Sequence, residues 1–167
     1  MKRMENYKDL VSKLDFSNVL FEDLPMEVGD KVNEIVIKFF DNREQIVNLL
    51  PENIKIVYLI GEFESAILND GLFSVFYNSS LEEIIQTREA IEKTNSTKLL
   101  KLFDNAKSLF EKEYTLKSDT SFVSENPDED VCDFFSEKLQ EKIERIEEKI
   151  GELQDSGEYW NKIEKLF

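Results

Sequence analysis

Histidine is absent from the 167 residues, and cysteine occurs once, at Cys132. Without histidine, the Ser-His-Asp and Cys-His arrangements of nucleophilic catalysis are excluded. A single cysteine excludes an internal disulfide, and no second cysteine or histidine is present to complete a zinc site. We therefore expect a protein that is not an enzyme and carries no cofactor and no metal, with Cys132 serving as a packing residue.

Glycine and proline are scarce as well, with 5 and 3 residues. No glycine-rich loop of the kind that cradles phosphates can be recognised. The chain is dominated by Glu, Lys, Leu and Ile, which favour helices joined by short loops. No apolar run reaches membrane-spanning length, and the charged opening residues do not resemble a secretory signal. We expect a cytoplasmic location.

Charge of one sign is in excess, because 36 acidic residues face 21 basic ones and give a formal net charge of -15. Proteins that bind nucleic acids gain affinity by neutralising phosphates with Lys and Arg, so direct binding to nucleic acid is disfavoured. An anionic membrane would repel the chain for the same reason. The acidity indicates a basic protein as partner, although solubility alone also selects such a bias.

The pattern of apolar residues predicts an all-α fold, a compact domain of about seven helices with a long acidic C-terminal helix. Helices are predicted over 5–14, 29–40, 51–68, 72–77, 80–91, 96–110 and 127–155, with a short helix after them. Asn69-Asp70-Gly71 is a helix-ending sequence, since Asn and Gly adopt the left-handed conformation most easily. Ser80 and Glu83 fit a capping box at the start of the next helix.

Three regions are predicted along the chain. Residues 1–114 form a helical core domain with the distinctive motif at 57–80, and residues 115–126, rich in Ser, Thr and Asp, form an exposed loop. Residues 127–167 form acidic C-terminal helices. Their apolar residues recur in steps of three and four, which fits docking on the same domain or on a second copy in a homodimer.

The densest acidic stretch is the candidate partner-binding surface. It comprises Asp128, Glu129, Asp130, Asp133 and Glu137. Asp130, Asp133 and Glu137 share one face if this stretch is helical, so three carboxylates would meet a cationic surface together. The alternative interpretation is an acidic first turn that is stabilised by the helix dipole and otherwise solvated.

The stretch 57–80 resembles the signature of a helical DNA-mimic protein family. In that family a helix ends in Asn-Gly-Gly-Phe and is followed by an aromatic segment and Asn-Ser. The residues that match are Asn69, Gly71, Phe76, Asn78 and Ser79. The resemblance extends over about 54–114. Three positions depart from it, because Asp70 replaces a glycine, Leu72 a phenylalanine and Ser74 the usual glutamine.

The resemblance implies a carboxylate surface that imitates phosphates and occupies the DNA-binding surface of a regulator. The matching residues are helix-end and packing positions, so they carry over a structural motif and no mimic residue. A second hypothesis is an immunity-type or regulatory interaction protein that uses an apolar groove, with the acidity serving solubility. A carboxylate-dependent metalloenzyme is a third, and we rank it last.

Overall fold

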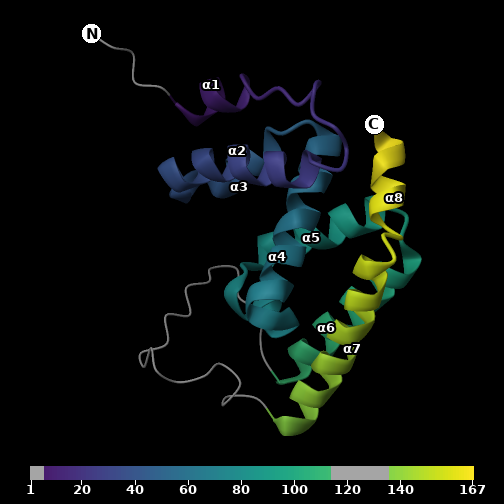
Figure 1. Cartoon of the computed structure of the whole chain (residues 1–167). Helices are drawn as coiled ribbons and strands as arrows, with labels where there is room; N and C mark the ends of the chain where they lie inside the picture. Colours follow the sequence, from purple (N-terminus) through teal and green to yellow (C-terminus); the bar gives the residue numbers. More distant parts are fainter. Residues whose placement is uncertain (1–5, 114–135) are drawn as a thin grey trace.

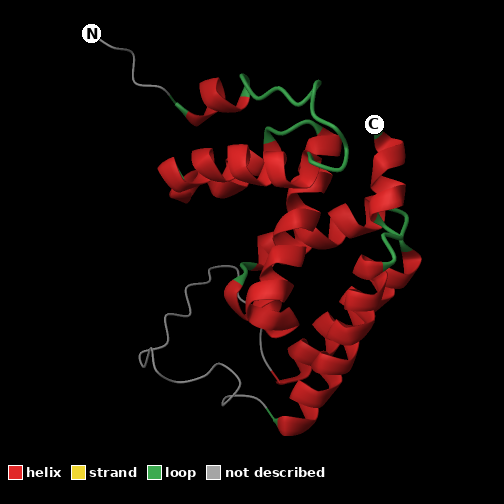
Figure 2. Ribbon diagram, in the orientation of Figure 1, coloured by secondary structure: helices red, strands yellow, loops and turns green. Residues whose placement is uncertain are grey.

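The computed structural model describes residues 6–113 and 136–167, which form helices and connecting turns without any strand (Figures 1 and 2). The helices are α1 Tyr7–Val11, α2 Leu24–Lys38, η1 Phe40–Asn42, α3 Arg43–Asn48, α4 Glu52–Asn78, α5 Leu81–Lys93, α6 Thr97–Glu113, α7 Glu137–Asp155, α8 Trp160–Ile163 and η3 Glu164–Leu166. The predicted all-α class is therefore confirmed. No helix in these two ranges has the length and apolar character needed to cross a membrane.

Helix α4 connects the two ends of the molecule. Helices α1, α2 and α3 lie together at one end, α6 and α7 lie side by side toward the other, and α8 returns toward α2 (Figure 1). Rings hold that return in place, because Phe21, just before α2, packs edge-on against Trp160 and Phe167 at 6.4 and 5.8 Å between centroids. The N-terminal and C-terminal segments are thus packed against each other.

The core is centred on α4, whose buried apolar residues extend well beyond one face of the helix. Val57 and Ile60 are fully buried, and Tyr58 is 1% exposed. Apolar residues on more than one face of a helix need neighbours on more than one side, and here α2, α5 and α7 supply them. Farther along α4, the Phe76 ring lies 5.3 Å from that of Phe103. The aromatic segment of the motif is therefore core, as its pattern predicts.

One predicted boundary in the N-terminal half is wrong, and one helix there was missed. Helix α2 begins at Leu24, five residues before the predicted start, because Pro25 occupies its first turn, where a missing amide hydrogen costs nothing. Helix α3 was not predicted at all. With six residues, it is shorter than the window of about 11–18 residues over which helical periodicity is recognised.

The C-terminal end also differs from the prediction. The chain ends in the four-residue α8 and a 3₁₀ turn, so the long acidic helix is not the C-terminal one. The long acidic helix is α7, of 19 residues. It is followed by a left-handed turn at Gly157, which has φ 63°. The predicted loop 115–126, the predicted helix start at 127 and Cys132 lie outside the described residues.

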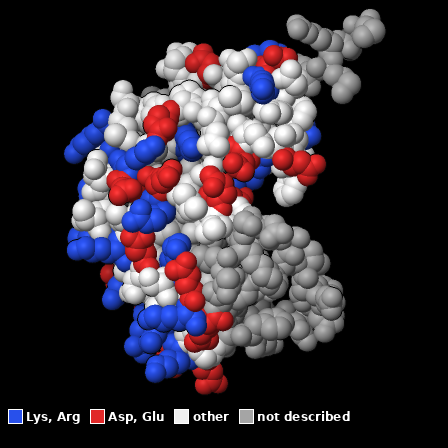
Figure 3. Space-filling model, turned by 180° about the vertical axis from the view of Figure 1, so that it is seen from behind, with Lys and Arg blue, Asp and Glu red and all other residues white. Residues whose placement is uncertain are grey.

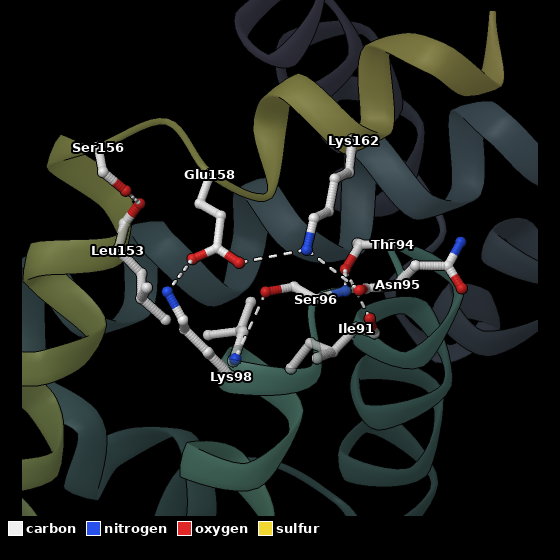
Figure 4. Close-up of polar contacts among 10 residues, drawn as sticks. Ile91, Thr94, Asn95, Ser96, Lys98, Leu153, Ser156, Glu158 and Lys162 are labelled. Carbon is white, nitrogen blue, oxygen red and sulfur yellow. Dashed lines mark hydrogen bonds and ion pairs between the residues drawn. The ribbon is translucent and has the colours of Figure 1, made fainter.

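A polar cluster joins the α5–α6 turn to α8 (Figure 4). Lys162 donates to the carbonyl of Asn95 at 3.1 Å, and Glu158 accepts from both Lys162 and Lys98 at 3.2 and 3.3 Å. The pKa of the Glu158 carboxyl is lowered, and the hydrogen bond from Lys162 is the largest cause. Asn95 has φ 59°, a left-handed conformation that Asn adopts more readily than most residues, because a short polar side chain can hydrogen-bond locally. These contacts fix the C-terminal helix over the turn.

Candidate functional site

The motif at 69–79 contains a break inside α4. Gly71 has φ 79° and ψ 165°, a region that is essentially restricted to glycine, and it divides the helix into two segments. The Asn69-Asp70-Gly71 sequence therefore interrupts the helix, as predicted, but a second helical segment follows at once. That segment confirms the helical prediction for 72–77.

The break frees a backbone amide, and a carboxylate from α7 satisfies it. Leu72 N donates to Glu147 Oε2 at 2.7 Å. A Cβ on residue 71 would lie 3.3 Å from the same oxygen, closer than an ordinary contact. Ser74 Oγ donates to the Gly71 carbonyl at 2.8 Å and closes the other side of the break. Glycine is thus required at position 71 both by its φ and by the approach of Glu147.

The other motif residues have structural environments. Phe76 is 1% exposed, and Ser79 is the C-cap of α4. Asn69 is exposed and donates from Nδ2 to Ser65 Oγ at 3.2 Å, while Asn78 is exposed at the helix end. The motif therefore determines where α4 bends and ends. The structure places none of these side chains together in one cavity.

The outer face of α7 carries a row of carboxylates. Its members are Glu137, Glu141, Glu144, Glu148, Glu152 and Asp155, and all six are exposed. Successive members are three or four residues apart, so they lie on one face of the helix. The buried residues of α7, such as Ile143 and Ile150, lie on the opposite face and pack against α6 and α4. We call the six carboxylates the α7 acidic row.

One predicted partner-binding residue, Glu137, belongs to the α7 acidic row. The other four, Asp128, Glu129, Asp130 and Asp133, lie outside the described residues. Five members of the row were missed by sequence reasoning. Their signal was present, since the acidic steps of three and four match the apolar steps on the opposite face.

Much of the remaining surface is mixed in charge. On the face seen in Figure 3, acidic and basic side chains are interspersed. Within the described residues, ion pairs also connect helices: Arg43 pairs with Glu83, and Arg88 with Asp104, where Nε lies 2.7 Å from Oδ1. On such a surface the two signs neutralise each other locally. In the part of the chain that the structure describes, only Glu141 of the α7 acidic row has an ion pair, with Arg145 of the same helix at 3.7 Å, so the row is the candidate for charge recognition.

A groove of about 490 Å³ lies between α2 and α4. Asp30, Glu62 and Glu64 line it, and no Lys or Arg does. At its base, Tyr58 donates from its hydroxyl to Asn33 Oδ1 at 2.8 Å, and Asn33 Nδ2 donates to Glu62 Oε1 at 3.1 Å. Burial, reinforced by the charge of Glu62, raises the pKa of Tyr58 to about 12. The tyrosine therefore stays a neutral donor.

Glu64 joins this groove to the C-terminus. Its Oε1 accepts hydrogen bonds from the Tyr159 hydroxyl and, at 2.8 Å, from Trp160 Nε1. Burial raises the pKa of the Glu64 carboxyl, although these hydrogen bonds act in the opposite direction. Burial and the adjacent Glu64 charge also raise the pKa of Tyr159. The Glu64 carboxyl thus links α4 to the C-terminal segment, and burial disfavours its charged form.

Within 6–113 and 136–167, no group of three His, Cys, Asp or Glu side chains is arranged to hold a metal ion. The fold and its surface define an all-helical acidic protein with a carboxylate row on its outer long helix.

The chain belongs to the DMP19-like protein family, whose model matches residues 48–167. The match covers α4 to α8 and extends beyond the stretch 54–114 in which the sequence motif showed its resemblance. Helices α1 and α2 precede the matched residues. Comparisons with curated proteins and with solved structures found no match.

Proposed function

We propose that this protein is a non-enzymatic DNA mimic whose carboxylates occupy the basic nucleic-acid-binding surface of a partner protein. The α7 acidic row carries the proposal. Along α7, successive carboxylates are separated by a rise of about 4.5–6 Å, at 1.5 Å per residue. Phosphates along one DNA strand are separated by a rise of about 3.4 Å, so the two rows present negative charge on the same scale.

Membership of the DMP19-like family supports the proposal, because this is the DNA-mimic family that the 69–79 motif resembles. The sequence adds a further point. Asp130 and Asp133 continue the spacing of the row on its N-terminal side, in steps of three and four residues. A partner that contacts the row would therefore meet six carboxylates on one helix face, with more acidic residues immediately preceding it in the chain.

The test is a pull-down from lysate at low and moderate salt, with a variant in which the row is neutralised. Glu144→Gln, Glu148→Gln and Glu152→Gln together remove three charges from exposed positions of α7 without removing helix-forming residues. We expect loss of a basic nucleic-acid-binding protein that the wild type retains. Retention should also weaken as salt rises, because exposed charges are screened.

The matched control removes the same number of charges elsewhere, with Asp41→Asn, Glu44→Gln and Glu89→Gln. All three residues are exposed and lie outside α7. The control should retain the partner. Equal loss from both variants would indicate a response to net charge alone, and retention of no basic protein by the wild type at either salt would refute the mimic function.

The alternative, an immunity-type or regulatory protein that binds through an apolar groove, predicts a different result. Partner binding should then survive neutralisation of the row. It should also survive charge reversal by Asp128→Lys, Asp130→Lys and Asp133→Lys together, which under the mimic proposal weakens binding.

A further inference from the structure

We propose that the groove between α2 and α4 is a second contact surface, which takes an arginine side chain from a basic protein partner. This inference deepens the proposed function and rests on it for the identity of the partner as a basic protein. The geometry of the groove is independent of the α7 acidic row.

Charge complementarity is the first argument. Asp30 is exposed at the groove and has no ion pair in the described chain. The adjacent cation, Lys31, pairs with Glu27 instead, at 3.3 Å. Glu62 accepts from Asn33 through Oε1 only, so Oε2 is available to an incoming donor. With the carboxylates of Asp30 and Glu62 open to it and no Lys or Arg in its lining, the groove attracts a cation.

The rim provides apolar contact beside these carboxylates. Met26 and Leu68, from opposite walls, are 64% and 77% exposed, although both are large hydrophobic residues. Methionine adapts its shape to what it contacts, which suits a binding surface. A long cationic side chain can lay its aliphatic stem on such a rim and extend its charged end to the carboxylates.

Two glycines leave the groove open. Gly29 in α2 and Gly61 in α4 both line it, and a Cβ added to either would meet nothing within 4 Å. Neither has the positive φ that requires glycine. Each glycine in a helix interior costs about 1 kcal/mol relative to alanine. No contact within the chain requires glycine at either position, and a group from outside can approach the backbone closely there.

Arginine matches these features better than lysine. Its planar guanidinium presents five donors and is weakly hydrated, so it can contact several acceptors in a partly desolvated groove. The carboxylates of Asp30 and Glu62 and the amide oxygen of Asn33 lie along the lining and accept hydrogen bonds. Ammonium, in contrast, is a compact charge that retains its water.

The groove depends on a part of the chain outside the family match. Its α2 wall, with Met26, Gly29 and Asp30, precedes residue 48, whereas its α4 wall lies within the match. The surface is therefore a property of this chain that the DMP19-like match does not account for.

The probe is acetyl-arginine methylamide, titrated into the ¹⁵N-labelled full chain and followed through backbone amide shifts. The backbone amide signals of the glycines provide the readout, because the chain has only 5 glycines and their signals are few. We expect saturable shifts at Gly29 and Gly61, with Gly151 of α7 unchanged. Binding should be about threefold or more tighter than that of acetyl-lysine methylamide, because the guanidinium bonds its acceptors as a fork.

A variant that fills the groove provides the second arm. Gly61→Leu extends a side chain into the open space and should weaken acetyl-arginine methylamide binding about tenfold or more, because the ligand loses its contacts. Gly151→Leu, which also places its Cβ in open space but lies on α7, should bind like the wild type. Thermal unfolding of both variants checks that each is folded.

Three results would overturn the groove proposal: equal binding of the lysine compound, shifts at Gly151 as large as those at Gly61, or unchanged binding by Gly61→Leu. None of these affects the pull-down with the neutralised α7 row. Conversely, if that pull-down fails while the Gly29 and Gly61 shifts occur, the arginine site stands and the mimic function does not.

Discussion

Gly71 is a residue whose backbone conformation determines the course of a whole helix. Alanine at this position must adopt φ near 79° and approach Glu147 Oε2 at 3.3 Å. We predict that Gly71→Ala lowers the free energy of unfolding by about 1–3 kcal/mol, the usual cost of such strain. Urea denaturation followed by circular dichroism measures this value.

Gly151→Ala is the matched control, because Gly151 lies within α7 and its added Cβ meets nothing within 4 Å. This variant should gain about 1 kcal/mol from helix propensity. If both alanine variants changed stability in the same direction, the special role of Gly71 would be excluded.

Glu64 predicts a pH dependence. Burial raises the pKa of its carboxyl above the ordinary value of 4.5, so the folded protein holds this proton more tightly than the unfolded chain does. Stability contributed by the protonated form is present below that ordinary value and is lost as pH rises through the raised one. Glu64→Gln keeps an acceptor for Tyr159 and Trp160 without the charge. We predict that the variant's Tm, relative to wild type, is higher at about pH 7 than at about pH 4.

Thermal unfolding of both proteins across this pH interval provides the measurement. Gln154, which also hydrogen-bonds Glu64, stays in place in both proteins. A difference in Tm that does not change with pH would contradict the assignment.

Single residues differed in how well the sequence predicted them. The helix break at Gly71 was predictable, because Asn-Asp-Gly is a local signal. The bond from Leu72 N to Glu147 was not, because its partners are 75 positions apart. The groove was unpredictable for the same reason: it exists only where α2 crosses α4, and no local pattern describes that crossing.

At the scale of elements, the start of α5 is determined by its cap. Ser80 Oγ accepts from Glu83 N at 3.1 Å, and Glu83 Oε2 accepts from Ser80 N at 2.7 Å, which confirms the predicted capping box. We predict that Ser80→Ala costs about 1 kcal/mol of unfolding free energy, because an amide at the helix start loses its acceptor. Chemical denaturation provides the value.

Ser108→Ala in the middle of α6 is the comparison, since Ser108 is exposed and caps nothing. There the exchange should be neutral or stabilise by up to about 0.5 kcal/mol, because alanine is the better helix former. An equal loss at both serines would argue against a capping effect. Glu83 is a poorer probe of the cap, because it also pairs with Arg43.

Elements with strong local signals were the predictable ones. Helix α6 was expected from its apolar spacing and runs over Thr97–Glu113. Helix α3, six residues long, is held by the burial of Ile46 and Val47 in a core assembled from distant segments. Its stability comes from tertiary packing, and its sequence is too short to contain a local pattern that predicts a helix.

At the scale of the molecule, the net charge of -15 predicts opposite responses to salt. Self-repulsion opposes folding, so added NaCl should raise the Tm of the isolated protein. The exposed ion pairs that salt also screens contribute little and do not reverse this trend. Retention of the basic partner should fall over the same range. Thermal scans and pull-downs at matched salt concentrations test both, and a Tm that decreases with salt would refute the first.

The bond between Glu147 and the amide of Leu72 has a consequence for how the chain is made. Synthesis proceeds from the N-terminus, so the amide freed at Gly71 has no protein acceptor until residue 147 has been added. Helix α4 can form its first segment early, but its bend becomes secure only when α7 docks. Because contacts between distant residues slow folding, the nascent protein keeps its central helix incomplete until α7 has been synthesised.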